Sequence, residues 1–142
     1  MYNMSNIVYL NTLQPGDRVV LPKSSLGLIQ HHALYVGKDN VGNRLYIENA
    51  IGRGVQIITE SYLFKDGYQI TRIERFHGSP NQRQMAVRSA IKMLGKQYDL
   101  INFNCEHYAN NIQHRRSYSH QVENGLVLGL IALLLGAGLT KV

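Results

Sequence analysis

The most informative stretch of the sequence is Asn-Cys-Glu-His-Tyr, at residues 104–108. Asn is favoured just before a helix, because its side-chain oxygen accepts hydrogen bonds from the free N–H groups of the first turn. Asn104 therefore predicts a helix that begins at Cys105 and runs through Ile112. The positive end of a helix dipole favours a thiolate over a thiol, and first-turn N–H groups can stabilise an oxyanion. Cys105 is thus a candidate nucleophile.

A nucleophilic cysteine needs a base within hydrogen-bonding reach, and six histidines compete for this role. His31 and His32 begin a predicted strand, where alternation sends their side chains to opposite faces, so only one of them can face the helix. His107 lies two residues after the cysteine, which turns it about 200° away around a helix. The other histidines fall in predicted loops or at a helix end: His77, His114 and His120.

Upstream of the cysteine, the sequence predicts a small antiparallel sheet. Short runs rich in β-branched and aromatic residues alternate with turns that contain Gly, Pro, Asp or Asn. Tight turns between successive strands favour antiparallel pairing. The predicted strands cover residues 18–21, 31–36, 44–48, 55–59 and 68–76.

The spacing of apolar residues then changes to that of a helix. Ser79 and Pro80 are favoured at the residue before a helix and at its first position. Gly95 is well placed to end the helix. We predict a helix over residues 80–94, which together with the helix at Cys105 gives an α+β fold class.

Composition limits the classes of partner and compartment. The 142 residues carry a formal net charge of +6, which favours anionic surfaces such as lipid headgroups or nucleic acid. The chain has no Trp and no recognisable nucleic-acid-binding motif, so we expect no nucleic-acid partner. The single cysteine excludes an intramolecular disulfide and a zinc site built on several thiolates; we expect neither metal nor cofactor. No secretory signal is recognisable, so the expected compartment is the cytoplasm.

The last part of the chain differs from the rest. Residues 125–139 form an uncharged apolar run, which as a helix spans about 22 Å against a hydrocarbon core of roughly 30 Å. We expect residues 1–123 to form one domain and residues 124–142 to form an apolar C-terminal helix that anchors it to a membrane. The alternative is a buried helix that covers the sheet.

Three motifs in order resemble one known family: LQPGD at 13–17, HHALYVG at 31–37 and NCEHY at 104–108. This is the lecithin:retinol acyltransferase and HRAS-like suppressor family, whose members are circularly permuted relatives of the NlpC/P60 papain-like fold. The resemblance covers roughly residues 13–113. It implies a permuted papain-like fold, in which a small antiparallel sheet packs against helices.

The resemblance also implies roles for individual residues. The nucleophile of the family falls on Cys105, and its base falls on His31. A third polar residue, often a second histidine, orients the base from the next strand. This chain departs from the pattern there and offers Glu48, which the register favours, and Asn49, which papain-like chemistry tolerates well; either side chain could fix the imidazole tautomer.

The implied activity is attack by Cys105 on an ester of an acyl lipid at a membrane surface. The resulting thioester would pass its acyl group to water, an amine or an alcohol, as in an acyltransferase or a phospholipase-type hydrolase. Two alternatives stay open: a cysteine peptidase or amidase on the same scaffold, and a catalytically silent membrane-associated binding module. The sequence does not constrain the oligomeric state.

Overall fold

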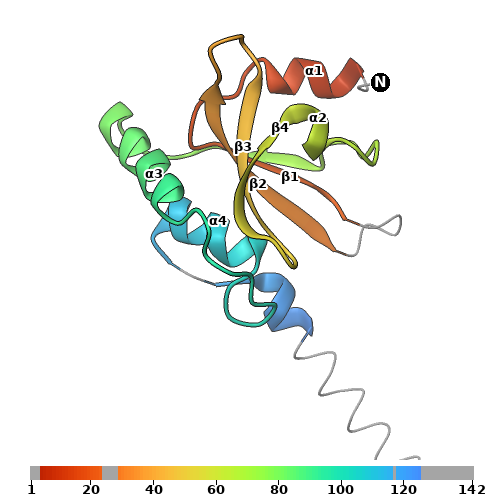
Figure 1. The fold of residues 1–142 in the computed structure, drawn as a ribbon, viewed down its shortest axis with the longest axis vertical. Coiled ribbons are helices and arrows are strands. Elements are labelled where there is room, and N and C mark those ends of the chain that lie inside the picture. Colours follow the sequence, from red (N-terminus) through yellow and green to blue (C-terminus); the bar gives the residue numbers. More distant parts are fainter. Residues whose placement is uncertain (1–3, 24–28, 117, 126–142) are drawn as a thin grey trace, which may run out of the picture.

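The computed structural model describes residues 4–23, 29–116 and 118–125 (Figure 1). Within these residues the chain folds into a five-stranded antiparallel sheet with helices on both faces, which confirms the predicted α+β class. The strands are β1 (Arg18–Pro22), β2 (Gln30–Lys38), β3 (Arg44–Ala50), β4 (Gly54–Thr59) and β5 (Arg72–Glu74). The helices are α1 (Met4–Leu10), α2 (Glu60–Leu63), α3 (Pro80–Lys92) and α4 (Cys105–His114).

The strand order is β4-β3-β2-β1-β5, so the first four strands form a meander. Four predicted strands lie within β1 to β4, but the fifth is much shorter than the predicted range of 68–76. Only three residues of β5 pair with β1. Thr71 N–H still donates to the carbonyl of Val20 in β1 at 2.8 Å. Farther out the backbone bonds to side chains: Ile70 N–H donates to Asn6 Oδ1 and Phe76 N–H donates to Asp17 Oδ1, both at 3.0 Å. These side chains end the pairing at the edge of the sheet.

Each face of the sheet carries its own apolar core, because successive side chains of a strand point to opposite faces. The face that contacts α1 and α2 buries Leu10, Val19, Leu21, Ala33, Tyr35, Tyr46, Ile58, Leu63 and Phe64. The face covered by α3 and α4 buries Leu34, Ile47, Val55, Ala86, Ala90, Phe103, Tyr108, Ala109 and Ile112. Figure 1 shows the two pairs of helices on opposite sides of the sheet. Neither α1 nor α2 was predicted from the sequence.

Both predicted helices begin where the sequence indicated. Ser79 Oγ accepts a hydrogen bond from the N–H of Gln82, three residues into the helix, and α3 follows from Pro80. Asn104 Oδ1 accepts hydrogen bonds at 3.0 Å from two N–H groups in the first turn of α4. Local capping chemistry therefore fixes Cys105 as the first residue of its helix.

A buried guanidinium fastens α4 to the sheet. Arg18 of β1 is 2% exposed and donates to Gln113 Oε1 at 2.9 Å and to Asn110 Oδ1 at 2.7 Å, both on α4. Its third nitrogen forms an ion pair with Glu74 of β5 at 3.2 Å. Arg18 thus joins three elements and holds the helix that carries Cys105 against the sheet.

The predicted apolar C-terminal helix lies almost entirely outside the described residues, which end at Gly125. Over the part of the chain that the structure describes, no helix has the length and apolarity needed to cross a bilayer.

The turn between β3 and β4 supports the loop that precedes α4. Val55 N–H donates to the carbonyl of Lys96 at 2.9 Å, and Gly95 N–H donates to that of Val55 at 2.9 Å. Gly54 has φ +73°, and a Cβ at this position would lie 2.3 Å from the Lys96 oxygen. This close approach of two backbones requires glycine.

We predict that Gly54→Ala destabilises the fold by clearly more than Gly52→Ala. Gly52 has a similar φ of +75°, but a Cβ at this position would meet no atom within 4 Å, so its substitution costs only the backbone strain of about 1–2 kcal/mol. Urea unfolding of the two variants measures the difference. Equal losses would show that the loop carrying Lys96 does not need this close contact.

Candidate active site

The candidate site lies where α4 begins beside the first residues of β2. Cys105 is 5% exposed, and its thiol donates to the carbonyl oxygen of Gln30 at 3.8 Å. Gln30 is the first residue of β2, so this contact places the first turn of α4 beside the beginning of the strand. The next residue of the strand is His31, the histidine that the resemblance assigns as the base.

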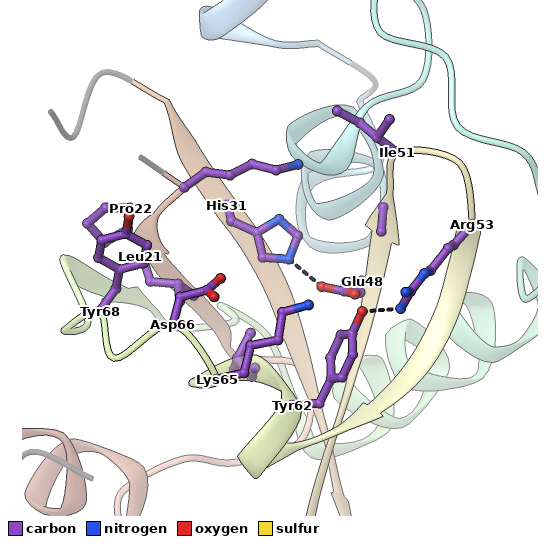
Figure 2. Close-up of a pocket in the computed structure, with 13 residues that line it drawn as sticks. Leu21, Pro22, His31, Glu48, Ile51, Arg53, Tyr62, Lys65, Asp66 and Tyr68 are labelled. Carbon is purple, nitrogen blue, oxygen red and sulfur yellow. Dashed lines mark hydrogen bonds and ion pairs between the residues drawn. The ribbon is translucent and has the colours of Figure 1, made fainter. Parts of the chain in front are cut away.

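His31 forms a hydrogen-bonded ion pair with Glu48 of the neighbouring strand β3, between Nε2 and Oε2 (Figure 2). The second carboxylate oxygen of Glu48 accepts a hydrogen bond from Gln56 Nε2 of β4 at 2.8 Å. Glu48 is almost completely buried, so these two bonds hold its carboxylate in one orientation. Three adjacent strands thus contribute one side chain each to a continuous polar row.

The charge state of His31 follows from its two acidic neighbours. Burial on its own lowers the pKa of an imidazole, but interaction with Cys105 and with Glu48 outweighs burial and raises the pKa of His31 to about 9. The same pairing holds the pKa of Glu48 below its usual value, although burial opposes this. At neutral pH the pair is therefore imidazolium and carboxylate.

The two ring nitrogens of His31 face different groups. Nε2 is held by Glu48, whereas Nδ1 is buried and makes no formed hydrogen bond with the described residues. Cys105 contributes to the raised pKa of His31, so the thiol lies within interaction range of the imidazole.

His32 has the opposite environment, although it is adjacent in sequence. It lies on the face of β2 that α4 covers, 1% exposed, with Nδ1 3.3 Å from Arg18 Nη1. Burial and the charge of Arg18 both lower the pKa of His32. The histidine that faces the body of α4 is therefore neutral and structural. His31 points to the other face of the sheet, where it lines the cleft.

Asn49 does not contact His31. Alternation along β3 turns it to the face opposite Glu48, where it is fully buried and its Nδ2 donates to the carbonyl of Phe103 at 2.8 Å. Phe103 lies two residues before Cys105, so Asn49 supports the loop that leads into α4. Of the two candidates for the third position, only Glu48 is brought to His31.

The residues after Cys105 organise the start of α4. His107 Nδ1 accepts a hydrogen bond from the backbone N–H of Asn104 at 3.3 Å, as part of the helix cap. Glu106 is buried and accepts from Ser119 Oγ at 2.6 Å and from the N–H of Gln121 at 3.0 Å. Glu106 therefore ties the segment that follows α4 to the same end of the molecule.

Several residues at the site carried no recognised signal in the sequence. Gln56 was predictable in principle, because the β3–β4 hairpin register places it opposite Glu48. Gln121 Oε1 accepts from the N–H of Gln30 at 3.0 Å, a contact across 91 positions with no local pattern to announce it. Tyr98 is also close: burial, with a contribution from Cys105, raises its pKa to about 12.

A cleft of about 310 Å³ opens beside His31 on the face away from α4 (Figure 2). Three exposed cations line it: Lys23, Arg53 and Lys65. Tyr62 stands between two of them, since Arg53 donates to its hydroxyl and the Lys65 ammonium lies 4.1 Å from its ring centroid. Among the described residues, no group of three or more His, Cys, Asp or Glu side chains is arranged to hold a metal ion.

These features define a class of domain: an α+β fold with a cysteine at a helix N-terminus and a histidine–carboxylate pair on the adjoining sheet. The family model for lecithin retinol acyltransferase matches residues 11–118, and the chain belongs to this family. The resemblance seen in the three sequence motifs is thereby confirmed. Membership indicates acyltransferase or hydrolase-type activity on lipids. No curated protein matches the chain.

We predict that Glu48→Gln lowers the pKa of His31 from about 9 towards the ordinary 6.5. Because the folded-state pKa lies above that of the unfolded chain, protonated His31 stabilises the fold fully below about pH 6.5. This contribution is lost as pH rises through about 9, and Glu48→Gln diminishes it. An NMR titration of the His31 ring protons measures the shift.

The matched control is Glu60→Gln, which removes the carboxylate that pairs with Arg44 elsewhere in the fold. It should leave the His31 pKa unchanged. A wild-type His31 that titrates near 6.5 would contradict the described ion pair.

Proposed function

We propose that this chain is a cysteine-dependent acyltransferase or phospholipase-type hydrolase that acts on lipid esters, in a domain of circularly permuted papain-like topology. The observation that carries the proposal is the position of His31, which pairs with Glu48 and lies within interaction range of the Cys105 thiol. Membership of the lecithin retinol acyltransferase family supports a lipid ester as the substrate.

In the first step, His31 holds the proton of Cys105, and the thiolate attacks the carbonyl carbon of the acyl ester. A C–S bond forms, and the carbonyl electron pair moves to oxygen. When the tetrahedral intermediate collapses, the ester C–O bond breaks and the alkoxide leaves with the proton of the His31 imidazolium. The products are a deacylated lipid and an acyl thioester on Cys105.

The intermediate needs donors for its oxyanion, and the helix cap limits which are free. The N–H groups of Glu106 and His107 already donate to Asn104 Oδ1. The remaining first-turn donor is the N–H of Cys105 itself, so we assign the oxyanion to this group. Of the first-turn N–H groups that the sequence offers for the oxyanion, the proposal therefore uses that of Cys105 alone.

In the second step, neutral His31 removes a proton from water, an amine or an alcohol, which attacks the thioester. The tetrahedral intermediate collapses, the C–S bond breaks and the thiolate leaves, while His31 keeps the proton, which restores the starting thiolate and imidazolium. Glu48 stabilises the imidazolium that forms in each step and fixes the ring orientation. The proposed steps use two reacting side chains, one backbone N–H group and the substrates, so the proposal requires no cofactor.

The proposed setting is the cytoplasmic surface of a membrane. Residues 125–139 supply an apolar stretch next to the domain, and the basic residues at 114–116 precede it, as expected for a cytoplasmic domain followed by a membrane anchor. A lipid substrate and an anchor of this kind are mutually consistent.

Intact mass spectrometry after incubation with a short-chain phosphatidylcholine tests the nucleophile. We expect an increase of one acyl group on the wild-type chain and none on Cys105→Ala. We expect His31→Ala to slow formation of the adduct by about 10²–10⁴-fold, the usual contribution of a general base. His120→Ala, at an exposed position after α4, is the control and should behave as wild type.

Rapid hydrolysis could keep the adduct from accumulating, so turnover of the same lipid is measured in parallel. Turnover that survives Cys105→Ala would overturn the proposal. Turnover of peptide substrates without lipid turnover would favour a cysteine peptidase or amidase instead.

A further inference from the structure

Four exposed aliphatic side chains surround the end of the molecule where α4 begins. They come from three separate segments: the entry to β2, the β3–β4 turn and the loop between α3 and α4. Each is between 50% and 63% exposed, although single exposed residues of this kind are usually scattered. These residues, here named the apolar rim, are Ile29, Ile51, Leu100 and Ile101.

Hydrogen bonds place the three segments next to one another. Asn104 Nδ2, beside Cys105, donates to the carbonyl of Leu100 at 3.1 Å. The Cys105 thiol contacts the carbonyl of Gln30, the residue after Ile29. The β3–β4 turn joins the same loop through the bond from Val55 to Lys96. The segments that carry the apolar rim therefore meet near Cys105, and Figure 2 shows Ile51 at the end of the hairpin beside the cleft.

Cations accompany the apolar rim. Lys23, Arg53 and Lys65 line the adjoining cleft and are exposed, as is Lys96 in the loop before α4. Among the described residues, the exposed carboxylates at this end are fewer than these four cations: Asp66, Asp99 and Glu123. Asp66 is the exposed carboxylate in the lining of the cleft. The balance of charge around the apolar rim is positive, which suits an anionic surface.

The position of the last described segment of the chain also favours a lipid surface as the partner. Gln121 binds the backbone of Gln30, so the short helical segment at 120–125 lies at the same end of the molecule as the apolar rim. The sequence from Gly125 onward continues as an uncharged apolar run. The described chain therefore ends at the same end of the molecule as the apolar rim.

We propose that the apolar rim inserts into an anionic lipid bilayer, with Lys23, Arg53, Lys65 and Lys96 against the headgroups. Side chains of this size on a membrane-facing surface enter the region between headgroups and acyl chains, where burial of apolar area stabilises binding. The cleft beside His31 then opens directly onto the lipid. The insertion does not depend on the chemistry of Cys105, so it can fail or hold separately from the proposed function.

Tryptophan reporters test the insertion in the full chain, because the natural sequence contains no Trp. Leu100→Trp and Ile51→Trp are made separately in a Cys105→Ala chain, so that catalysis plays no part. The probe is a vesicle of phosphatidylcholine and phosphatidylserine with bromine atoms on the upper acyl chain, the depth of about 5–10 Å at which interfacial side chains lie. We expect both reporters to shift to shorter wavelength and to lose most of their emission.

The matched control is Val41→Trp, since Val41 is 81% exposed in the turn between β2 and β3, at the opposite end of the nine-residue strand β2. Anchoring by residues beyond the domain brings all three variants to the vesicle equally, so only insertion of the apolar rim separates them. Emission at positions 51 and 100 that matches position 41 would overturn the proposal. A shift that depends on protein concentration without vesicles would also overturn it, because a second copy of the chain would then cover the apolar rim.

Discussion

The architecture depends on one buried cation, Arg18 of β1, which donates hydrogen bonds from the sheet to α4. A guanidinium removed from water is costly unless its donors are satisfied, and here Gln113, Asn110 and Glu74 satisfy them. The geometry of the hydrogen bonds fixes both the position and the rotation of α4 on the sheet. Because Cys105 is the first residue of that helix, the same bonds determine where the thiol lies relative to β2.

The same cation separates the roles of two adjacent histidines. His32 lies beside Arg18 in the packed interface, which disfavours its protonation, whereas His31 lies between a carboxylate and a thiol, which favour it. A difference of one position along a strand therefore produces a neutral structural imidazole and a charged one at the cleft. His31 and His32 would exchange environments only if α4 packed on the other face of the sheet.

Side-chain hydrogen bonds organise the end of the molecule that carries Cys105. Asn104 caps α4 and occupies two first-turn N–H groups, Glu106 holds the segment after the helix, and that segment returns to the entry of β2 through Gln121. The exposed aliphatic and basic side chains lie on the loops that these bonds bring together. The helix cap thus shapes both the polar interior and the apolar surface of this end.

The sequence by itself determined the elements whose signals are local. The caps at Ser79 and Asn104, the four longer strands and the α+β class follow from interactions within a few residues, and three ordered motifs were enough to identify the family. Only the tertiary structure decided between Glu48 and Asn49 as the neighbour of His31. That choice depends on the pairing register of β2 and β3, which places Glu48 opposite Ala33 and therefore on the face of the sheet to which His31 also points. The length of β5, the contact of Gln121 with Gln30 and the position of the apolar rim were decided in the same way, because each joins segments far apart in the chain whose meeting no local pattern encodes.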